Sequence, residues 1–459
     1  MGKSIKVSEN LRLNDAILLF DNYNQDSQAL HTSLKMAGFD CPAVVIEDDG
    51  FLPDDVMSVY GYFLGDFKAM LGDKARPKYF NEITVPDYWE ISGTNSNGKV
   101  QDLYKERGRM FYAEPKHKRL VKIVDWYDER GVVRSSDHYN RYGAIYGRTI
   151  FNNKGQKVNK SYFSVEGKEI IVENFVTGDI ILNEENETHI FRNKTELVLH
   201  FFVRANFKQS RIFFNSLSTP FFVSNRLKSQ VKRDVLFWQE PIWDDIPGNM
   251  LSIFNGEASR TTTVMVQKKK SYDKLIELGA KKDMVHKLGF IYPFAKENKH
   301  QPEVLICTNS DNIEYCEELV KAMPQMHFHI TALTEMSSKL TALDAYDNVS
   351  LYPGVKTSIL DELFETCDYY FDINHESEIV SAVHKAFLHN HLIFAFKETM
   401  HNADYVAEEH VFLASEWERM CADVKTAMAD VKVAKKMLQR QKRTALAETV
   451  KSYQKLGAI

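Results

Sequence analysis

Residues 16–46 read AILLFDNYNQDSQALHTSLKMAGFDCPAVVI, and this stretch determines the class of the fold. The apolar runs at residues 16–20 and 43–46 are typical of buried strands. The residues between them have the spacing of an amphipathic helix, and Gly38 can end that helix by adopting a positive φ. A strand, a helix and a second buried strand in this order predict a βαβ unit with a parallel sheet.

A different pattern begins near Met110 and continues to Leu182. Short β-rich runs alternate with tight turns, in which glycine supplies the positive φ that hairpins require. These turns lie at residues 129–131, 153–156, 166–168 and 177–178. Consecutive hairpins predict an antiparallel β-meander inserted into the α/β domain. Such an insert offers a long face and an edge that can pair with another chain.

The α/β pattern returns from Asn193 to Val266, and a polar linker near residues 292–302 precedes a second alternation of strands and helices. We expect strands at 303–307, 327–331, 349–352, 369–373, 392–396 and 411–413, and helices at 312–322, 359–367 and 379–388. The chain is therefore predicted to be an α/β protein with a GT-B-like arrangement, in which two Rossmann-like doubly wound domains carry an inserted antiparallel β-meander.

These patterns predict five segments. The N-terminal Rossmann-like domain is expected in two parts, at 1–105 and 193–295, separated by the inserted meander for partner association at 106–192. The C-terminal Rossmann-like domain is expected at 296–415, and the C-terminal helices at 416–459. The tail is expected to form one or two helices with a basic side, which is either packed and solvated or attracted to anionic lipid.

Composition excludes several classes of protein. The 459 residues carry a formal net charge of −5, which gives no whole-chain reason to expect nucleic acid as a partner. There is no run of about twenty apolar residues, and the first five residues lack the apolar stretch of a signal peptide. We expect a cytoplasmic protein, peripheral on the cytoplasmic face of the membrane. Five cysteines without C-x-x-C spacing are expected to be reduced, buried thiols: Cys41, Cys307, Cys316, Cys367 and Cys421.

Motifs that would indicate catalysis or metal binding are absent from the sequence. It contains no Walker A loop, G-x-G-x-x-G, H-E-x-x-H or G-x-S-x-G motif. The acidic run at residues 47–50 could be a carboxylate metal site for a nucleotide-sugar, although acidic loops at strand ends are common. His327 and His329 share one face of a predicted strand, but no third ligand is evident. A structural role for both is favoured, and no metal site is expected.

Two α/β domains joined by a linker bury small ligands in the cleft between them, as nucleotide-sugar glycosyltransferases do. Their donor signature is a Glu, seven residues, and a second Glu before a small residue. Residues 374–386 read NHESEIVSAVHKA, so Lys385 stands where the second Glu belongs and Ser377 where the first belongs. The loop at residues 307–311 also lacks the basic residue that would hold a pyrophosphate. The outline of a donor site is present without its chemistry.

Four strings resemble the GtfB family of accessory Sec proteins of streptococci and staphylococci: FDNYNQDSQ at 20–28, VIEDDGFLP at 45–53, FWQEPIW at 237–243 and DINHESE at 372–378. The resemblance covers nearly the whole chain. It implies a stabilising, co-activating subunit of the catalytic glycosyltransferase GtfA, in a heterotetramer of two plus two. It also implies that the pair transfers N-acetylglucosamine to Ser and Thr of serine-rich repeat adhesins before export, and that the two subunits associate through their meanders.

The resemblance implies an acceptor-peptide cleft and no catalytic or cofactor-binding residue in this chain. The expected lining consists of Trp238, Gln239, Glu240, Trp243, Asn255, Asn374, Glu376 and Glu378. Core packing remains the alternative for the tryptophans, and a solvated loop or helix N-terminus for the glutamates. A basic cluster is expected to contact the partner or the membrane, with a solvated strand as the alternative: Lys116, Lys118, Arg119 and Lys122.

Two other functions stay open at this point. An active glycosyltransferase with an atypical donor site would use Glu376 or Glu378 to hold the sugar. A purely structural scaffold would keep its partner soluble without touching the acceptor.

Overall fold

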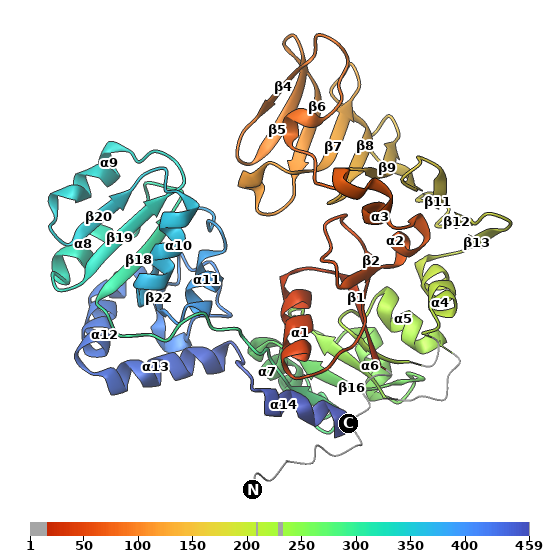
Figure 1. Cartoon of the computed structure of the whole chain (residues 1–459). Helices are drawn as coiled ribbons and strands as arrows, with labels where there is room; N and C mark the ends of the chain where they lie inside the picture. The colour runs from red at the N-terminus through yellow and green to blue at the C-terminus, as the bar shows by residue number, and fades with distance from the viewer. Residues whose placement is uncertain (1–15, 208–209, 228–232, 459) are drawn as a thin grey trace, which may run out of the picture.

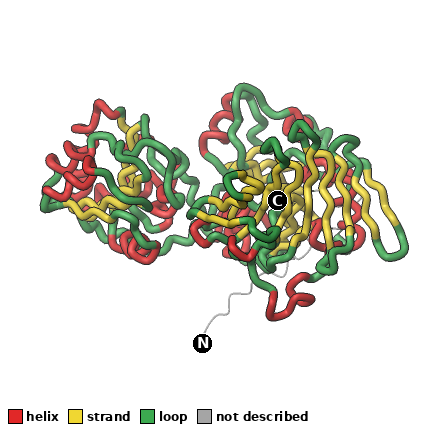
Figure 2. Tube along the Cα trace, turned by 90° about the horizontal axis from the view of Figure 1, so that it is seen from above, coloured by secondary structure: helices red, strands yellow, loops and turns green. Residues whose placement is uncertain are grey.

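The computed structural model describes residues 16–207, 210–227 and 233–458. They form two Rossmann-like domains and a large inserted sheet, which rises away from the first domain (Figure 1). Seen from above, the second domain separates from the body that contains the first domain and the insert (Figure 2). The predicted class, α/β with a GT-B-like arrangement and an inserted antiparallel meander, is confirmed.

The first domain contains, within the described residues, a seven-stranded parallel sheet in the order β17-β16-β15-β14-β1-β2-β3. Its strands are β1 (Ala16–Asn22), β2 (Ala43–Glu47), β3 (Val56–Ser58), β14 (Arg211–Phe214), β15 (Asp234–Trp238), β16 (Thr261–Val266) and β17 (Val285–Lys287). Its helices are α1 (Gln25–Met36), α2 (Val59–Leu64), α3 (Phe67–Leu71), α4 (Lys194–Arg204), α5 (Thr219–Arg226), α6 (Gly248–Phe254) and α7 (Lys269–Glu277).

The βαβ unit predicted from residues 16–46 is confirmed, because β1 and β2 pair in parallel and α1 connects them. The side chain of Asn24 caps α1 by accepting a hydrogen bond from the backbone N–H of Ser27 at 2.9 Å. Chain order reverses between β1 and β14, which are neighbours in the sheet. A crevice at the carboxyl ends of the strands is expected at such a reversal.

The insert is a ten-stranded antiparallel sheet spanning residues 90–191, all of them described. Its strands follow chain order: β4 (Glu90–Gly93), β5 (Asn97–Asp102), β6 (Lys105–Tyr112), β7 (Val121–Tyr127), β8 (Val133–Tyr139), β9 (Ile145–Phe151), β10 (Lys157–Phe163), β11 (Glu169–Asn174), β12 (Ile180–Asn183) and β13 (Thr188–Phe191). Strands β4 and β5 lie before residue 106, where the meander was expected to start. Their sequences are polar and carry Gly93 and Gly98, so they lack the apolar alternation that marks the later strands.

The second domain contains, over described residues 303–412, a six-stranded parallel sheet in the order β20-β19-β18-β21-β22-β23. Its strands are β18 (Glu303–Thr308), β19 (His327–Ala332), β20 (Val349–Tyr352), β21 (Tyr369–Asp372), β22 (Leu392–Phe396) and β23 (Val411–Phe412). Its helices are α8 (Cys316–Ala322), α9 (Ser338–Thr341), α10 (Thr357–Thr366) and α11 (Ala382–Leu388). Helices α8 and α11 begin later than predicted, because Tyr315 and Ser381 before them have left-handed φ values of 50° and 51°.

The tail differs from the predicted one or two helices. Its described part forms α12 (Trp417–Ala429), α13 (Val431–Thr444) and α14 (Val450–Gln454). The first two lie on the second domain, whereas α14 returns to the first domain (Figure 1). There the buried Tyr453 donates a hydrogen bond to the carbonyl of Gly289 at 2.6 Å. A Cβ at Gly289 would lie 2.0 Å from the carbonyl oxygen of Leu446, so glycine is required for this crossing. None of the described helices has the length and apolar character needed to cross a membrane.

We predict that Tyr453→Phe lowers the free energy of unfolding by about 1–2 kcal/mol, because the ring stays packed while the carbonyl of Gly289 loses the shorter of its two side-chain hydrogen bonds and keeps only that from Gln267 at 3.4 Å. The measurement is the thermal midpoint and urea midpoint of the full chain. The matched control is Tyr88→Phe, since Tyr88 is 98% exposed. Equal effects of the two substitutions would contradict the inferred role of this hydrogen bond.

Candidate functional site at the interdomain cleft

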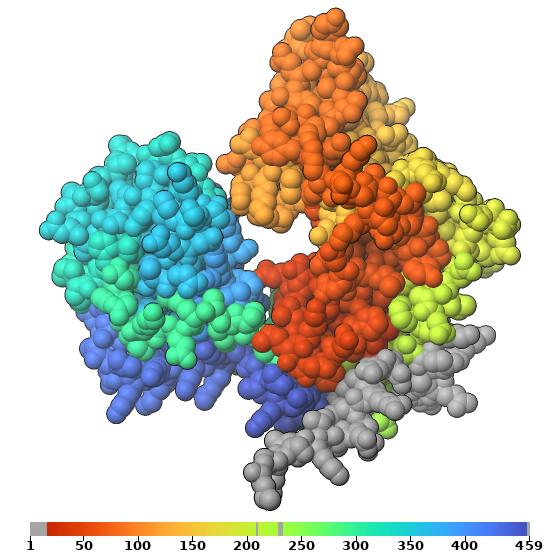
Figure 3. Space-filling model, in the orientation of Figure 1, coloured from red at the N-terminus to blue at the C-terminus, as the bar shows by residue number. Residues whose placement is uncertain are grey.

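An opening separates the second domain from the first domain and its insert (Figure 3). The two domains meet at its floor, where Nε2 of Gln25 lies 2.6 Å from Nδ1 of His384. Burial lowers the pKa of His384 to about 4, so its neutral ring can accept a hydrogen bond from the Gln25 amide. Gln25 starts α1 just beyond the carboxyl end of β1, and His384 lies in the first turn of α11, beyond the carboxyl end of β21. The carboxyl edges of the two sheets therefore face one another.

A second contact between the domains is ionic. The Nζ of Lys268 lies 3.1 Å from Oδ2 of Asp26 in the first domain and 3.2 Å from Oδ2 of Asp404 in the second. Burial alone would lower the pKa of Lys268, but the two carboxylates raise it on balance. The half-buried ammonium group of Lys268 thus forms ion pairs with one carboxylate from each domain.

Behind the first-domain side of the cleft lies a buried network of amides. The Nδ2 of Asn215 donates to Oγ of Ser27 at 2.9 Å and to Oε1 of Gln239 at 3.1 Å. The Nε2 of Gln239 donates to Oε1 of Gln267 at 2.8 Å, and Nε2 of Gln267 lies 3.4 Å from the hydroxyl of Tyr453. The carboxyl ends of β1, β14, β15 and β16 are in this way tied to the C-terminal helix α14.

The expected acceptor-binding residues of the first domain divide by burial. Trp238 and Gln239 are buried, the first in the core as the last residue of β15 and the second in the amide network. These two side chains lie behind the surface of the cleft, whereas we expected them to line it. Glu240, Trp243 and Asn255 are exposed, and Trp243 keeps 75% of its surface accessible. Burial and the charge of Asp21 raise the pKa of Glu240.

The second-domain members follow β21. Asn374 is buried, contrary to its expected place in the lining, and its amide donates to the carbonyl of His375 at 3.1 Å. Glu376 is exposed, whereas Glu378 is half-buried and caps α11 by accepting from the N–H of Val383 at 2.7 Å. Burial raises the pKa of Glu378. Glu378 therefore lies at a helix N-terminus, which was the alternative to a place in the peptide-binding lining.

The loop that carries Glu376 has an unusual backbone. Glu376, Val380 and Ser381 have φ values of 71°, 45° and 51°. Left-handed φ costs free energy in a residue with a side chain, most of all in a β-branched one such as Val380. Strained residues of this kind cluster at ligand-binding and switch regions of proteins.

The sequence did not reveal a histidine that lies beside this loop. The Nδ1 of His401 is 2.5 Å from Oδ1 of the buried Asp372, and its Nε2 is 2.8 Å from the carbonyl oxygen of Glu376. The hydrogen bond that His401 donates to the Asp372 carboxylate raises the pKa of His401 to about 9, so the ring is a cation near pH 7. The two residues are 29 positions apart, and no local motif connects them.

Lys385 occupies the second acidic position of the donor signature and is bound within the protein. Its Nζ forms an ion pair with Asp361 of α10 and lies 4.5 Å from the centroid of the Phe364 ring. The cation is therefore directed to a neighbouring helix.

The acidic run at residues 47–50 joins the insert to the first domain. Glu47 forms an ion pair with Lys194, and Oδ2 of Asp49 lies 2.6 Å from Nζ of Lys122 on β7. Asp48 is half-buried, and its Oδ1 accepts from the N–H of Gly50 at 2.7 Å. These partners account for all three acids without a metal.

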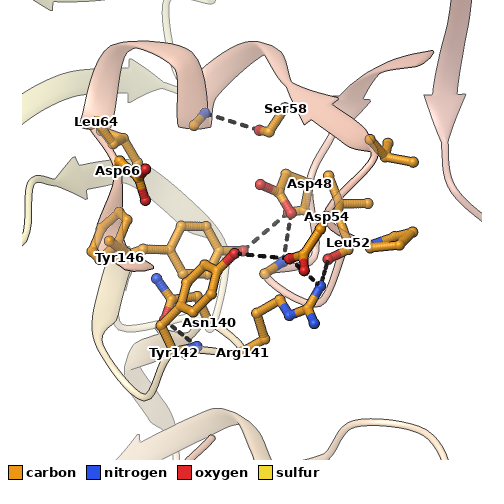
Figure 4. Close-up of a pocket in the computed structure, with 16 residues that line it drawn as sticks. Asp48, Leu52, Asp54, Ser58, Leu64, Asp66, Asn140, Arg141, Tyr142 and Tyr146 are labelled. Atoms are coloured by element: carbon orange, nitrogen blue, oxygen red, sulfur yellow. Dashed lines mark hydrogen bonds and ion pairs between the residues drawn. The ribbon is translucent and has the colours of Figure 1, made fainter. Parts of the chain in front are cut away.

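A cavity of about 190 Å³ lies beside this junction, between the loops after β2 and the turn between β8 and β9 (Figure 4). The hydroxyl of Tyr146 donates to the carbonyl of Asp48 at 3.1 Å, and Nη1 of Arg141 donates to the carbonyl of Leu52 at 2.7 Å. Side chains of the insert thus close one wall of the cavity.

The expected basic patch is split by the structure. Lys116 and Lys118 are exposed on a short 3₁₀ turn, and Arg119 follows them and donates to Oδ1 of Asn95 at 3.0 Å. Lys122 is half-buried and paired with Asp49, so it belongs to the junction described above. His327 and His329, the other early metal alternative, have hydrogen-bond partners in Ser350, Tyr352 and Glu303.

We predict that His401→Asn destabilises the chain in a pH-dependent way. A folded-state pKa of about 9, above the ordinary value of 6.5, means that the stabilisation is complete below pH 6.5 and is lost as the pH rises through 9. The thermal midpoints of wild type and variant should therefore differ by the equivalent of roughly 1–3 kcal/mol at pH 6 and converge above pH 9.5. His117→Asn, at an exposed site, is the control. A constant difference across this pH range would rule out a protonated His401.

Comparison with known proteins gives consistent matches along the chain. Residues 17–63 match the model of the GtfB N-terminal domain, 89–192 the GtfB middle domain, 194–278 the GtfB third domain and 304–441 the GftB/GlyA-F C-terminal domain. A protein of Streptococcus agalactiae named UDP-N-acetylglucosamine–peptide N-acetylglucosaminyltransferase stabilizing protein GtfB is 42% identical over 442 residues, which cover 96% of this chain and 98% of that protein. The protein of the same name from Streptococcus gordonii is 40% identical, with coverages of 95% and 97%.

Solved structures agree with these matches. A chain in the crystal structure of a GtfA/B complex bound to UDP and GlcNAc superposes with a TM-score of 0.90 at 40% identity, covering 96% of this chain and 98% of that one. A Staphylococcus aureus TarM structure, with 11% identity, a TM-score of 0.51 and coverages of 96% and 98%, shares the fold alone.

Proposed function

We propose that this chain, which belongs to the GtfB family of stabilizing proteins, is a non-catalytic subunit that holds the acceptor polypeptide for a partner glycosyltransferase. The partner is GtfA, and the pair is a peptide N-acetylglucosaminyltransferase. Two observations support this pairing: the relatives that match from end to end are named for stabilising such an enzyme, and a GtfA/B complex contains a chain of the same fold.

Lys385 is the observation that carries the non-catalytic part of the proposal. The sequence pattern aligns it with the second acid of the donor signature, and its ammonium is paired with Asp361. A carboxylate can accept hydrogen bonds from sugar hydroxyls, whereas an ammonium group only donates them. At this position the chain therefore lacks the hydrogen-bond acceptor that the donor signature supplies.

The acceptor in this proposal is the serine-rich repeat of an adhesin, modified on Ser and Thr before accessory Sec export. Such a polypeptide is polar and disordered, so it is bound by shallow contacts and main-chain hydrogen bonds. Trp243 offers an exposed aromatic surface, and Glu240 and Glu376 offer exposed polar groups. Glu240 and Trp243 follow the carboxyl end of β15 and Glu376 follows that of β21, so these are the side chains that we assign to peptide binding. Asn255 follows α6, which runs back toward the amino end of β16, so its expected place in the lining is wrong.

Retention of the acceptor explains how a subunit without its own chemistry stimulates transfer. A polypeptide held beside the partner's active site is present there at a high effective concentration, so successive serines are modified before release. We place this assembly, as two copies of each subunit, in the cytoplasm at the membrane face. Lys116, Lys118 and Arg119 are the basic groups that remain for the partner or for anionic lipid.

The outer end of the insert is the surface that we assign to GtfA. Tyr88, Leu103 and Tyr104 are 98%, 80% and 91% exposed there, at the start of β4 and in the β5–β6 turn. Strand β4 is an edge strand and lies at the end of the insert remote from the Rossmann-like domains (Figure 1). Exposed aromatic side chains beside an unpaired strand edge are typical of a protein interface.

We predict that the isolated chain binds an unmodified serine-rich peptide but neither binds UDP-GlcNAc nor transfers its sugar. Transfer should need the partner and should become faster when both subunits are present. Trp243→Ala should weaken peptide binding by roughly 1–2 kcal/mol without lowering the thermal midpoint, because this side chain is exposed. Calorimetric titration and a transfer assay with each subunit omitted in turn are the measurements.

In the peptide titration of the isolated chain, the control for Trp243→Ala is Tyr88→Ala, which removes an exposed aromatic group far from the cleft. Sugar transfer by this chain alone would establish the active-enzyme alternative instead. Unchanged stimulation of the partner together with no peptide binding would establish the scaffold alternative.

We also predict that the double substitution Leu103→Asp and Tyr104→Asp weakens association with GtfA at least about tenfold, because two charges must then be buried against an apolar interface. Analytical ultracentrifugation of the mixed subunits gives the measurement. Leu333→Asp, at a 44% exposed position of the second domain, is the control. If the double variant associates as tightly as the control, GtfA binds elsewhere on the chain.

A further inference from the structure

A group of three potential metal ligands lies where the last hairpin of the insert meets α4 of the first domain. Glu184 follows β12, His189 lies on β13, and His200 lies on α4. One ligand atom from each of the three lies within 4.8 Å of the other two, and no other group in the described ranges meets that criterion. The sequence alone did not indicate this site, because the residues come from three separate elements.

The glutamate is oriented toward the two imidazoles. Its Oε2 lies 3.1 Å from Nε2 of His189 and 3.7 Å from Nε2 of His200. Its Oε1 accepts a hydrogen bond from Nη2 of Arg204 at 2.8 Å. Arg204 therefore holds the carboxylate with one oxygen free to face the histidines, as residues behind a metal ligand do.

His200 has a nitrogen that the protein does not satisfy. Its Nε2 is buried without a hydrogen-bond partner. The rings of Phe63 and Phe191 lie 5.9 Å and 5.2 Å from the imidazole and cover it. A buried polar atom without a partner costs free energy, and a bound cation would supply the missing interaction.

We propose that Glu184, His189 and His200 bind one Zn²⁺ ion. Glu187 is the candidate fourth ligand, because its Oε2 lies 3.4 Å from Nε2 of His189. Two imidazoles and carboxylate oxygen suit Zn²⁺, which prefers tetrahedral nitrogen and oxygen ligands, and do not suit Ca²⁺ or Mg²⁺. Ligands of a tetrahedral zinc ion are about 3.3 Å apart, so binding requires the two rings to approach each other slightly.

The ion would have a structural role and no catalytic one. It would link the hairpin between β12 and β13, the outermost strands at this end of the insert, to a helix of the first domain. The orientation of the insert on the domain would then be fixed at more than one place in their junction, by the metal here and by the ion pairs of Lys194 with Glu173 and of Lys122 with Asp49. This inference is independent of the proposed acceptor binding.

The test uses the full chain without a histidine tag, freed of metal by chelation and titrated with ZnCl₂ against a chromophoric zinc indicator. We expect one equivalent of Zn²⁺ to bind and to raise the thermal midpoint. The double substitution His189→Gln and His200→Gln should weaken binding at least about tenfold and abolish the thermal shift. With Co²⁺ as the probe, visible d–d bands without a thiolate charge-transfer band would identify nitrogen and oxygen ligands and exclude the five cysteines.

The matched control is the double substitution His327→Gln and His329→Gln. These two rings are 4.8 Å apart, nearly the 4.7 Å of His189 and His200, but the nitrogens have partners in the protein. Circular dichroism checks that each variant is folded, and Glu184→Gln provides a single substitution if the double variant is not. Failure of the wild type to bind Zn²⁺, or equal binding by wild type and Glu184→Gln, would overturn the proposal.

Discussion

The return of the C-terminal helix to the first domain is the constraint on which the arrangement of the cleft depends. Helices α12 and α13 pack on the second domain, and α14 then crosses to place Tyr453 in the first domain's core. Its hydroxyl forms hydrogen bonds with Gly289 and Gln267. Gln267 is in turn hydrogen-bonded to Gln239, and Gln239 to Asn215. The chain passes between the domains twice, once through the linker and once through this tail. Two crossings restrict the relative motion of two bodies more than one does.

The insert is held by a different kind of interaction. Its junction with the first domain is built from charge, with Lys194 between Glu47 and Glu173 and with Lys122 on Asp49. Nearby, burial lowers the pKa of Lys160 to about 8. Glu173 is buried and the two lysines are half-buried, so a displaced partner leaves a charge that has lost part of its hydration. This junction therefore favours one orientation of the insert, which a surface for a partner protein requires.

The parts of the fold that the sequence predicted are those in which local pattern and burial agree. Strands β1 and β2 are apolar on both faces, so their parallel pairing follows from residues 16–46 alone. Strands β4 and β5 were missed because their polar sequences lack that signal, and α14 because a break after Ala445 hides a helix of only five residues. In the site, Trp238 and Trp243 stand five residues apart in one motif, yet the first is core and the second exposed. Only the path of the chain after β15 separates them.

The loop after β21 is supported by charged side chains of the second domain itself. His401 is held protonated by Asp372 and bonds the carbonyl of Glu376, while Lys385, which the sequence pattern aligns with an acid of the donor signature, is paired with Asp361. Each of the two cations has an acid of the same domain as its partner, so neither depends on a bound nucleotide for its charge balance. The strained loop from Glu376 to Ser381 is likewise supported from within, by His401 and by the cap that Glu378 gives to α11. A loop whose polar groups are satisfied by side chains of its own domain keeps this conformation without a bound ligand.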